Sequence, residues 1–178
     1  MLQTRSLNNS MNTISLDDLN VSTTKLIGKQ WMLITAGTPD KFNCMTASWG
    51  GLGVLWGKPV AYIFVRPNRH TVSFINEHPS LTLSFMPESH RADVLFCGRN
   101  SGRDVDKMAA TSLKAVTTET GLVTYEDAEL VLECRKMFKT RLQEADFLDW
   151  SEVCPKWYAE DNPLHDLYIC EITRAMVP

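Results

Sequence analysis

Three short segments of the chain carry residues that could bind a ligand, and the first spans positions 43–51. Its central residues combine hydroxyl groups, small side chains and peptide N–H groups at the predicted end of a strand: Met45, Thr46, Ala47 and Ser48. A planar redox ring needs hydrogen-bond donors along one edge and little side-chain bulk on its approach. The segment is suited to such a ring, although a strand-end turn with satisfied hydroxyls is the alternative.

The second segment, residues 65–71, closes a predicted strand and opens a predicted helix. Arg66 and Arg69 are candidate partners for an anion, and Thr71 adds a hydroxyl close to the start of the helix. Free N–H groups and the helix dipole favour phosphate at such a position. The alternative is a solvated pair of arginines.

The third segment, residues 97–107, gathers further donors in a predicted flexible loop: Ser101, Gly102, Arg103 and Lys107. Hydrogen bonds to charged groups contribute about 1.5–3 kcal/mol each, and micromolar binding needs about 8 kcal/mol. Two or three such contacts plus burial of a flat ring could reach that affinity. Together the segments predict a phosphate-bearing, planar ligand, whereas a polar surface loop is the alternative for the third.

Motifs for other chemistries are absent or incomplete. The glycines at positions 50, 51, 53 and 57 give Gly51-x-Gly53, but Trp56 occupies the place of the third dinucleotide-binding glycine. We therefore read these glycines as tight turns between strands. The sequence contains no phosphate loop of the G-x-x-x-x-G-K-[ST] type, no H-E-x-x-H and no G-x-S-x-G. Cys97 is read as a buried, inert cysteine.

Composition excludes several broad classes. The chain has 178 residues, 44% of them apolar, which predicts a single domain over residues 13–178 after a flexible, polar arm at 1–12. The net charge of −3 and the lack of basic runs argue against nucleic acid, and no apolar run could span a membrane. Five cysteines without a C-x-x-C pair argue against a disulfide framework or a zinc site, and favour a reducing, cytoplasmic setting.

The elements that must position the three segments are mostly strands. Apolar, β-branched and alternating runs predict them at 30–37, 42–50, 59–66, 81–86, 129–142 and 165–177, with 129–142 ambiguous beyond Arg135. The 81–86 run predicts a half-buried strand. Two short helices are expected, one capped by Asn68 and one capped by Ser89 and ended by Gly98, and 155–163 is a short helix or loop. Many strands with few helices indicate a mainly antiparallel barrel with peripheral helices.

The order of the motifs resembles a known family. N-x-M-T-A-S-W, L-W-x-K-P-V, R-P-x-R-x-T and S-G-R-D-x-D-K follow one another, and the strand at 164–172 closes the series, so that the resemblance runs from about Trp31 to Ile172. This series resembles the flavin reductase-like, flavoredoxin-type family of FMN-binding split-barrel proteins. Cys170 departs from the glycine that the family often has there.

The resemblance implies a split β-barrel, a homodimer, and FMN at the subunit interface. Met45, Thr46, Ala47 and Ser48 would contact the flavin ring and ribityl chain. The phosphate end would be bound mainly by Arg66, Arg69, Thr71, Ser101, Gly102 and Lys107. His165 matches the family's C-terminal histidine and is the candidate catalytic residue, with a structural strand histidine as the alternative. The segment at 143–163 is longer than in small members; it could be a lid that shapes substrate access, or it could simply cover the barrel.

The leading hypothesis is an FMN-dependent NADH or NADPH oxidoreductase that passes electrons to a second acceptor. The main rival is a flavoredoxin-type electron carrier reduced by a protein partner. A third reading is a split-barrel module for another ligand, such as heme or pyridoxal phosphate.

Overall fold

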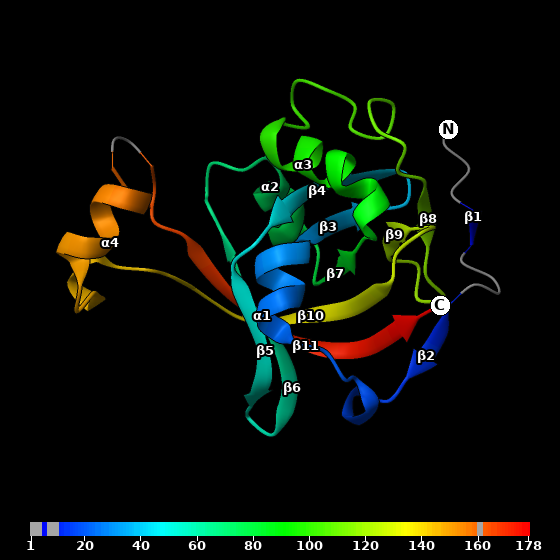
Figure 1. Cartoon of the computed structure of the whole chain (residues 1–178), viewed down its shortest axis with the longest axis horizontal. Helices are drawn as coiled ribbons and strands as arrows, with labels where there is room; N and C mark the ends of the chain where they lie inside the picture. The colour runs from blue at the N-terminus through cyan, green and yellow to red at the C-terminus, as the bar shows by residue number, and fades with distance from the viewer. Residues whose placement is uncertain (1–4, 7–10, 160–161) are drawn as a thin grey trace.

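The main feature of the computed structural model, which describes residues 5–6, 11–159 and 162–178, is an antiparallel sheet of eight strands. The strand order is β4-β3-β7-β10-β11-β6-β5, with β2 added to β11 (Figure 1). The strands are β2 (Asn12–Ile14), β3 (Met32–Thr38), β4 (Lys41–Ala47), β5 (Gly50–Leu55), β6 (Lys58–Val65), β7 (Ser80–Phe85), β10 (Leu130–Arg141) and β11 (Asp166–Val177).

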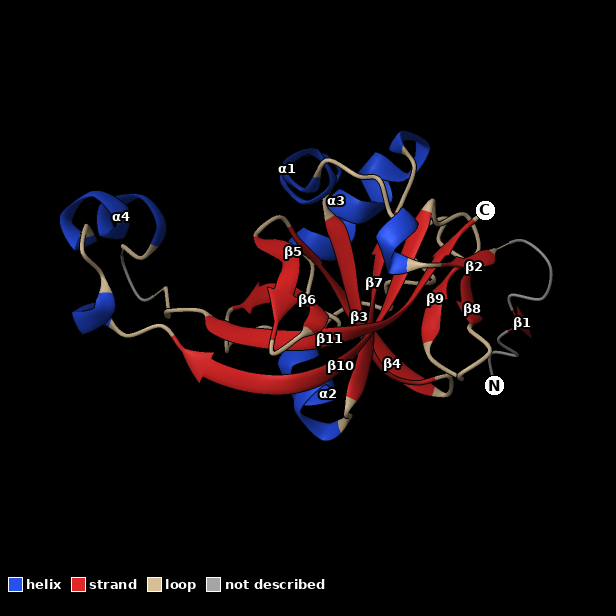
Figure 2. Cartoon of the chain, turned by 90° about the horizontal axis from the view of Figure 1, so that it is seen from below, coloured by secondary structure: helices blue, strands red, loops and turns tan. Residues whose placement is uncertain are grey.

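The sheet curls into an incompletely closed barrel. Strand β4 approaches β6, but the two are not hydrogen-bonded neighbours, and β4 and β5 form the two edges. Helices α2 (Thr71–Glu77) and α3 (Arg91–Arg99) pack against opposite faces of β3 and β4 (Figure 2), α2 on the main core of the sheet and α3 on a second apolar cluster. Shorter helical turns complete the description: η1 (Leu16–Asp18), α1 (Thr23–Lys25), η2 (Leu26–Gln30), η3 (Glu88–His90) and η4 (Glu144–Asp146). The predicted mainly β, split-barrel fold with peripheral helices is confirmed.

A second, small sheet covers the outside of the barrel at β7. It is formed by β1 (Arg5–Ser6), β8 (Ala115–Thr117) and β9 (Val123–Tyr125). Thr82 donates to the carbonyl of Val123 at 2.6 Å, and the hydroxyls of Ser84 and Thr124 lie 2.8 Å apart. The prediction that 81–86 is a half-buried strand is therefore wrong, because the small sheet covers the face that its polar residues point to.

The glycines after β4 do not simply mark turns. Gly50 and Gly51 lie within β5, and only Gly57 belongs to the turn that joins β5 to β6. Gly50 has φ +154°, and a Cβ there would come within 2.4 Å of the Tyr62 carbonyl oxygen. Close approach of the neighbouring strand, and not turn formation, is what requires glycine at this position.

Both predicted helix caps are wrong, and so is one helix end. Neither Asn68 nor Ser89 caps a helix through its side chain, and α3 begins only after the turn η3. Gly98 does not end α3 but lies in its last turn. A Cβ on Gly98 would be 3.1 Å from the Cβ of Thr46, so glycine lets the helix pack closely on β4.

An arm projects from one end of the barrel. Strands β10 and β11 pair over their whole length and lead into helix α4 (Trp150–Trp157), which stands apart from the barrel in both views (Figures 1 and 2). The doubtful part of 129–142 continues as strand to Arg141. At 155–163, where a short helix or a loop was expected, the structure has the end of α4, which begins earlier, at Trp150. Asp166, 1% exposed at the base of the arm, pairs with Arg141 at 2.6 Å and Lys139 at 3.1 Å.

The predicted N-terminal arm falls mostly outside the described residues, since 1–4 and 7–10 are not described and β2 begins at Asn12. In the described part of the chain, no helix has the length and apolar character needed to cross a membrane.

Candidate functional site

Two adjoining cavities lie where β4, the end of β6 and the loop after α3 meet. One, of about 260 Å³, has Trp49, Trp157 and His165 in its wall, and we call it the aromatic cavity. The other, of about 330 Å³, contains four arginines, and we call it the basic cavity. Met45, Arg66 and Arg69 line both. All eleven site residues predicted from the sequence line one cavity or the other: Met45, Thr46, Ala47, Ser48, Arg66, Arg69, Thr71, Ser101, Gly102, Lys107 and His165.

Asn43 holds the three predicted segments together. Its side-chain amide donates to the Thr71 hydroxyl at 2.8 Å, which links β4 to the start of α2. On the other side it lies so close to Gly102 that a Cβ there would come within 2.1 Å of the Asn43 amide oxygen. A side chain at position 102 would therefore push the 97–107 loop away from β4. Asn43 itself is 8% exposed.

Lys107 is buried and makes two backbone contacts. Its ammonium donates to the Cys44 carbonyl at 2.7 Å and to the Cys97 carbonyl at 2.8 Å. Burial lowers the pKa of Lys107, while the two neighbouring thiols oppose that shift. Lys107 thus lines the basic cavity, but its ammonium group is hydrogen-bonded to carbonyls of β4 and α3 and so connects these two elements at the base of the cavity, which we call its floor.

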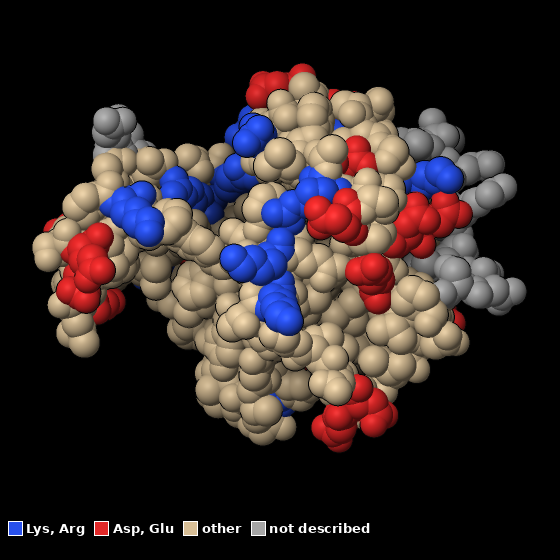
Figure 3. All heavy atoms as spheres, viewed as in Figure 1, with Lys and Arg blue, Asp and Glu red and all other residues tan. Residues whose placement is uncertain are grey.

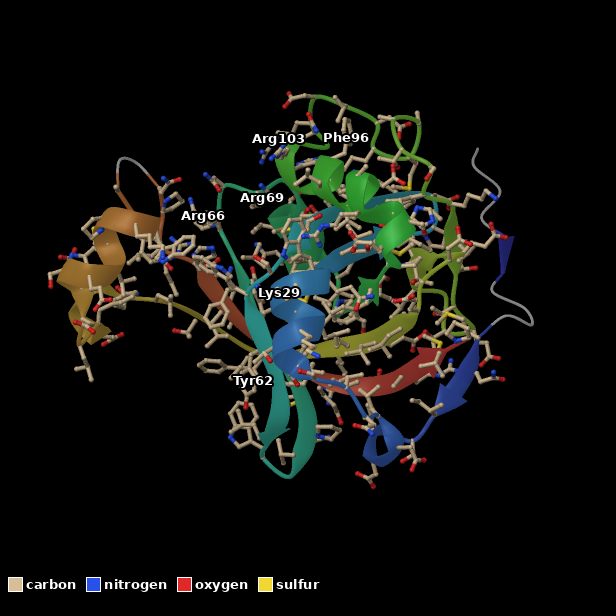
Figure 4. The ribbon with its side chains drawn as sticks, in the orientation of Figure 1. Lys29, Tyr62, Arg66, Arg69, Phe96 and Arg103 are labelled. Carbon is tan, nitrogen blue, oxygen red and sulfur yellow. The ribbon has the colours of Figure 1, made fainter. Side chains whose placement is uncertain are left out.

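The basic cavity has an excess of positive charge. Arg66, Arg69, Arg99 and Arg103 all line it, and among the described residues none of the four forms an ion pair. Figure 4 shows Arg66, Arg69 and Arg103 along one side of the molecule between the α4 arm and α3, and Figure 3 shows the band of basic residues on this face. Unpaired guanidinium groups that converge in this way favour an anion.

Three of these arginines already donate to backbone carbonyls, and Arg103 does so to Asn68 at 3.3 Å. Arg69 donates to the Gly98 carbonyl at 2.7 Å, and burial followed by repulsion from Arg66 lowers the pKa of Arg69. Arg66 instead donates to the Trp157 carbonyl at 3.0 Å and to the Asn162 side chain, so it connects β6 to the arm. Arg69 faces the loop after α3, whereas Arg66 joins the two cavities.

The aromatic cavity is walled by rings from the barrel and from the arm. The ring of Trp49 lies 4.9 Å from that of Trp157 and 4.7 Å from the imidazole of His165, measured between centroids. Tyr158 approaches His165 from the other side, with its hydroxyl 3.0 Å from Nδ1. A planar ligand entering this cavity would meet aromatic faces and edges.

His165 is neutral at neutral pH. Burial, followed by the charge of Arg66, lowers its pKa to about 4, although Asp166 acts in the opposite direction. The imidazole is therefore a neutral hydrogen-bonding group in this wall and not a reservoir of positive charge.

Beside the cavities, β4 is an edge strand with no further described strand paired to it, but some of its side chains already have hydrogen-bond partners. The Cys44 carbonyl accepts from Lys107 and therefore points away from β3. Residues two apart on a strand direct their backbone groups to the same side, so the N–H of Thr46 also points away from β3. The Thr46 hydroxyl, which we expected to be free, donates instead to the Val94 carbonyl. The backbone of this segment, more than its hydroxyls, is thus available to a ligand.

Apart from Arg103, ten residues that line the cavities were not predicted as site residues: Asn43, Trp49, Phe64, Asn68, His70, Gly98, Arg99, Asn100, Trp157 and Asn162. Asn43 had a signal, since a polar side chain interrupts an apolar strand and is buried there. Trp157 and Asn162 had none, because only the return of the arm brings them to the barrel.

The comparisons with known proteins agree with this architecture. Residues 24–178 match the model of the flavin reductase like domain. No curated protein matches the sequence.

Solved structures with the same fold share little sequence with this chain. An FMN-binding domain of a flavin reductases-like enzyme from Shewanella baltica superimposes with a TM-score of 0.67 at 14% identity, covering 95% of this chain and 78% of that one. Flavoredoxin from Methanosarcina acetivorans gives 0.63 at 19%, covering 92% and 74%. Nitrilotriacetate monooxygenase component B from Bacillus cereus gives 0.63 at 17%, covering 94% and 81%.

Proposed function

The chain belongs to the flavin reductase-like family, and on this premise we propose that it binds FMN and acts as an NADH- or NADPH-dependent oxidoreductase. One observation carries the proposal: three segments distant in the sequence converge on two adjoining cavities, one basic and one aromatic. That pairing suits a ligand with a phosphate at one end and a flat ring at the other. Together the cavities fall within the range of about 300–1,000 Å³ typical of ligand sites.

The basic cavity would hold the phosphate. Arg69 and Arg103 each donate one bond to a backbone carbonyl, at 2.7 and 3.3 Å, and keep further N–H groups for a ligand. The Thr71 hydroxyl accepts from Asn43 and can still donate. Charge-assisted bonds from these groups would contribute most of the binding free energy.

The aromatic cavity would hold the flat ring beside the open edge of β4. When bound, FMN would supply the hydride and electron chemistry between a reduced nicotinamide and a second acceptor. The backbone at Thr46 would orient one edge of the ring, while Trp49 and Trp157 would exclude water from it. Neutral His165 would offer a hydrogen bond at this wall without adding a positive charge.

A homodimer completes the proposal. Large apolar side chains are exposed on the β5–β6 hairpin and near the arm, with Trp56 at 59% and Leu148 at 104%. Exposed apolar groups of this size mark interaction surfaces. Light scattering on the purified protein tests this point, since a monomeric mass at micromolar concentration would contradict the dimer. All five cysteines are free thiols, which supports the proposed cytoplasmic setting.

The test of the proposed function is spectroscopic. The purified protein is incubated with FMN, desalted and scanned for flavin absorbance, and then mixed with NADH or NADPH without oxygen. Retained yellow colour that bleaches rapidly is the expected result. Colour that bleaches only when a reduced partner protein is added would favour the electron carrier, the second candidate. A protein that retains no FMN would overturn the proposal and favour a different ligand.

A further inference from the structure

Two thiols face each other behind the cofactor site. Cys44 on β4 and Cys97 on α3 are 53 positions apart in the chain, yet their sulfur atoms lie 3.8 Å apart. Cys44 is 1% exposed and Cys97 is fully buried. No step of the proposed function uses either side chain. Nothing in the sequence predicts that the two cysteines are neighbours, because they belong to different elements.

The surroundings make the two thiols chemically unequal. The contact with the Cys97 thiol outweighs burial and lowers the pKa of Cys44 to about 7, with smaller help from Tyr125 and Lys107. The same contact, together with burial, raises the pKa of Cys97. Cys44 is therefore the member of the pair that supplies a thiolate near neutral pH, and the thiolate is the nucleophilic form.

We propose that Cys44 and Cys97 form a reversible disulfide, produced by hydrogen peroxide, that cross-links the strand and the helix bordering the cofactor site. The Cys44 sulfur attacks one peroxide oxygen, forming an S–O bond while the O–O bond breaks and water leaves. The Cys97 sulfur then attacks the resulting sulfenic acid, forming the S–S bond as the S–O bond breaks and a second water leaves. Two thiols lose two electrons and two protons, and one peroxide becomes two waters.

The geometry permits closure with little movement of the backbone. The sulfurs must approach from 3.8 Å to the roughly 2.05 Å of a disulfide. A Cβ on Gly98, next to Cys97, would lie 3.1 Å from the Cβ of Thr46, so α3 already packs closely on β4 at this point. Rotation of the two cysteine side chains therefore has to supply most of the approach.

A third cavity, which shares Asn43 and Gly102 with the basic cavity, gives a small oxidant an approach to Cys44. This cavity, of about 450 Å³, includes Cys44, Gly102 and Lys107 in its wall. Peroxide is neutral and scarcely larger than water, whereas bulky thiol reagents would not reach a sulfur with so little exposed surface. Reduced flavins yield peroxide with dioxygen, so a local source of oxidant rests on the proposed function, but the thiol chemistry itself does not.

The test uses flavin-free protein, so that its outcome is independent of FMN binding. A Cys154→Ser background removes the thiol that is only partly buried and leaves four buried ones. After hydrogen peroxide treatment, denaturation and alkylation, two thiols should be lost and a Cys44–Cys97 cross-linked peptide should appear, with reversal by dithiothreitol. The melting temperature should rise by roughly 5–15 °C on oxidation. The rate of thiol loss should increase about tenfold from pH 6 to pH 8, following the thiolate of Cys44.

Matched variants make the result decisive. With Cys97→Ser, Cys44 should accumulate as a sulfenic acid that dimedone traps, and no cross-link should form. With Cys134→Ser, a buried thiol on β10, the Cys44–Cys97 link should form as before. Survival of all four thiols at a dose that oxidises free cysteine, or a link between other cysteines, would overturn the proposal.

Discussion

The basic and aromatic cavities share three residues but are built in different ways. The walls of the basic cavity are joined inside the barrel region by hydrogen bonds between β4, α2 and the loop after α3, through Asn43, Arg69 and Lys107. The aromatic cavity also has Trp157 of the α4 arm in its wall. The arm stands away from the barrel (Figure 1) and is connected to it here through Arg66 and Trp49. Under the proposed function, we therefore expect the binding of FMN phosphate to depend on the contacts within the barrel region, and the access of a second substrate to depend on the arm.

The largest effect should come from breaking the floor of the basic cavity. Lys107→Met leaves two buried carbonyls without their donor, and each such loss costs about 1–3 kcal/mol. We expect the free energy of unfolding, measured with urea, to fall by about 2–4 kcal/mol. Lys114→Met is the matched control, because Lys114 is exposed and its ion pair with Glu126 is worth less than about 1 kcal/mol. Equal stability of the two variants would show that Lys107 does not join β4 to α3.

The next effect concerns the grip on phosphate. Arg69→Gln removes a charge that a phosphate would meet, and a hydrogen bond to a charged group contributes about 1.5–3 kcal/mol. The Kd for FMN, from fluorescence titration, should rise about 10- to 100-fold. Arg174→Gln should leave it unchanged, since Arg174 binds Thr13 and Glu119 and lines neither cavity. A similar Kd for both variants would remove Arg69 from the site.

A smaller effect concerns the aromatic cavity, where His165 should make the stability of the protein depend on pH. The pKa of His165 is about 4 in the folded protein, below its ordinary value of 6.5, so the unfolded chain binds more protons between these values. The contribution of His165 to stability is thus fully present above pH 6.5 and is lost as the pH falls towards 4. Between pH 6.5 and 4.5 the wild type should lose about 1–2 kcal/mol more than His165→Gln in urea unfolding. Parallel pH profiles would argue against a buried, neutral histidine.

The smallest effect should appear in the second substrate alone. An aromatic pair is worth about 0.5–1.5 kcal/mol, so Trp157→Ala should lower kcat/KM for nicotinamide oxidation about 2- to 10-fold. The Kd for FMN should stay within about threefold of the wild type. Trp150→Ala is the control, since this ring of the arm lines neither cavity. If Trp157→Ala weakens FMN binding as much as Arg69→Gln does, the two cavities do not have separate roles.

Strand positions could be predicted well where local pattern and packing agree. The run at 59–66 became β6 over Lys58–Val65, because β-branched and aromatic residues fit a pleated strand wherever it packs. The alternation at 81–86 gave the strand but not its burial, since the small β8–β9 sheet covers the face on which Ser84 lies. The prediction of the helix end at Gly98 was wrong for a similar reason. Glycine at this position allows close packing against Thr46 and does not mark the end of the helix.

The hydrogen-bond donors of the candidate site could be predicted from the sequence, because hydroxyl, backbone N–H and guanidinium groups are donors in any fold. The sequence therefore determined the mainly β class and the three segments that line the cavities. Only the tertiary structure decided which partner each side chain contacts. Lys107 donates to two backbone carbonyls, Arg66 donates to the arm, and the sulfur of Cys44 lies next to that of Cys97. Such partners depend on contacts between residues far apart in the chain, which local spacing does not specify.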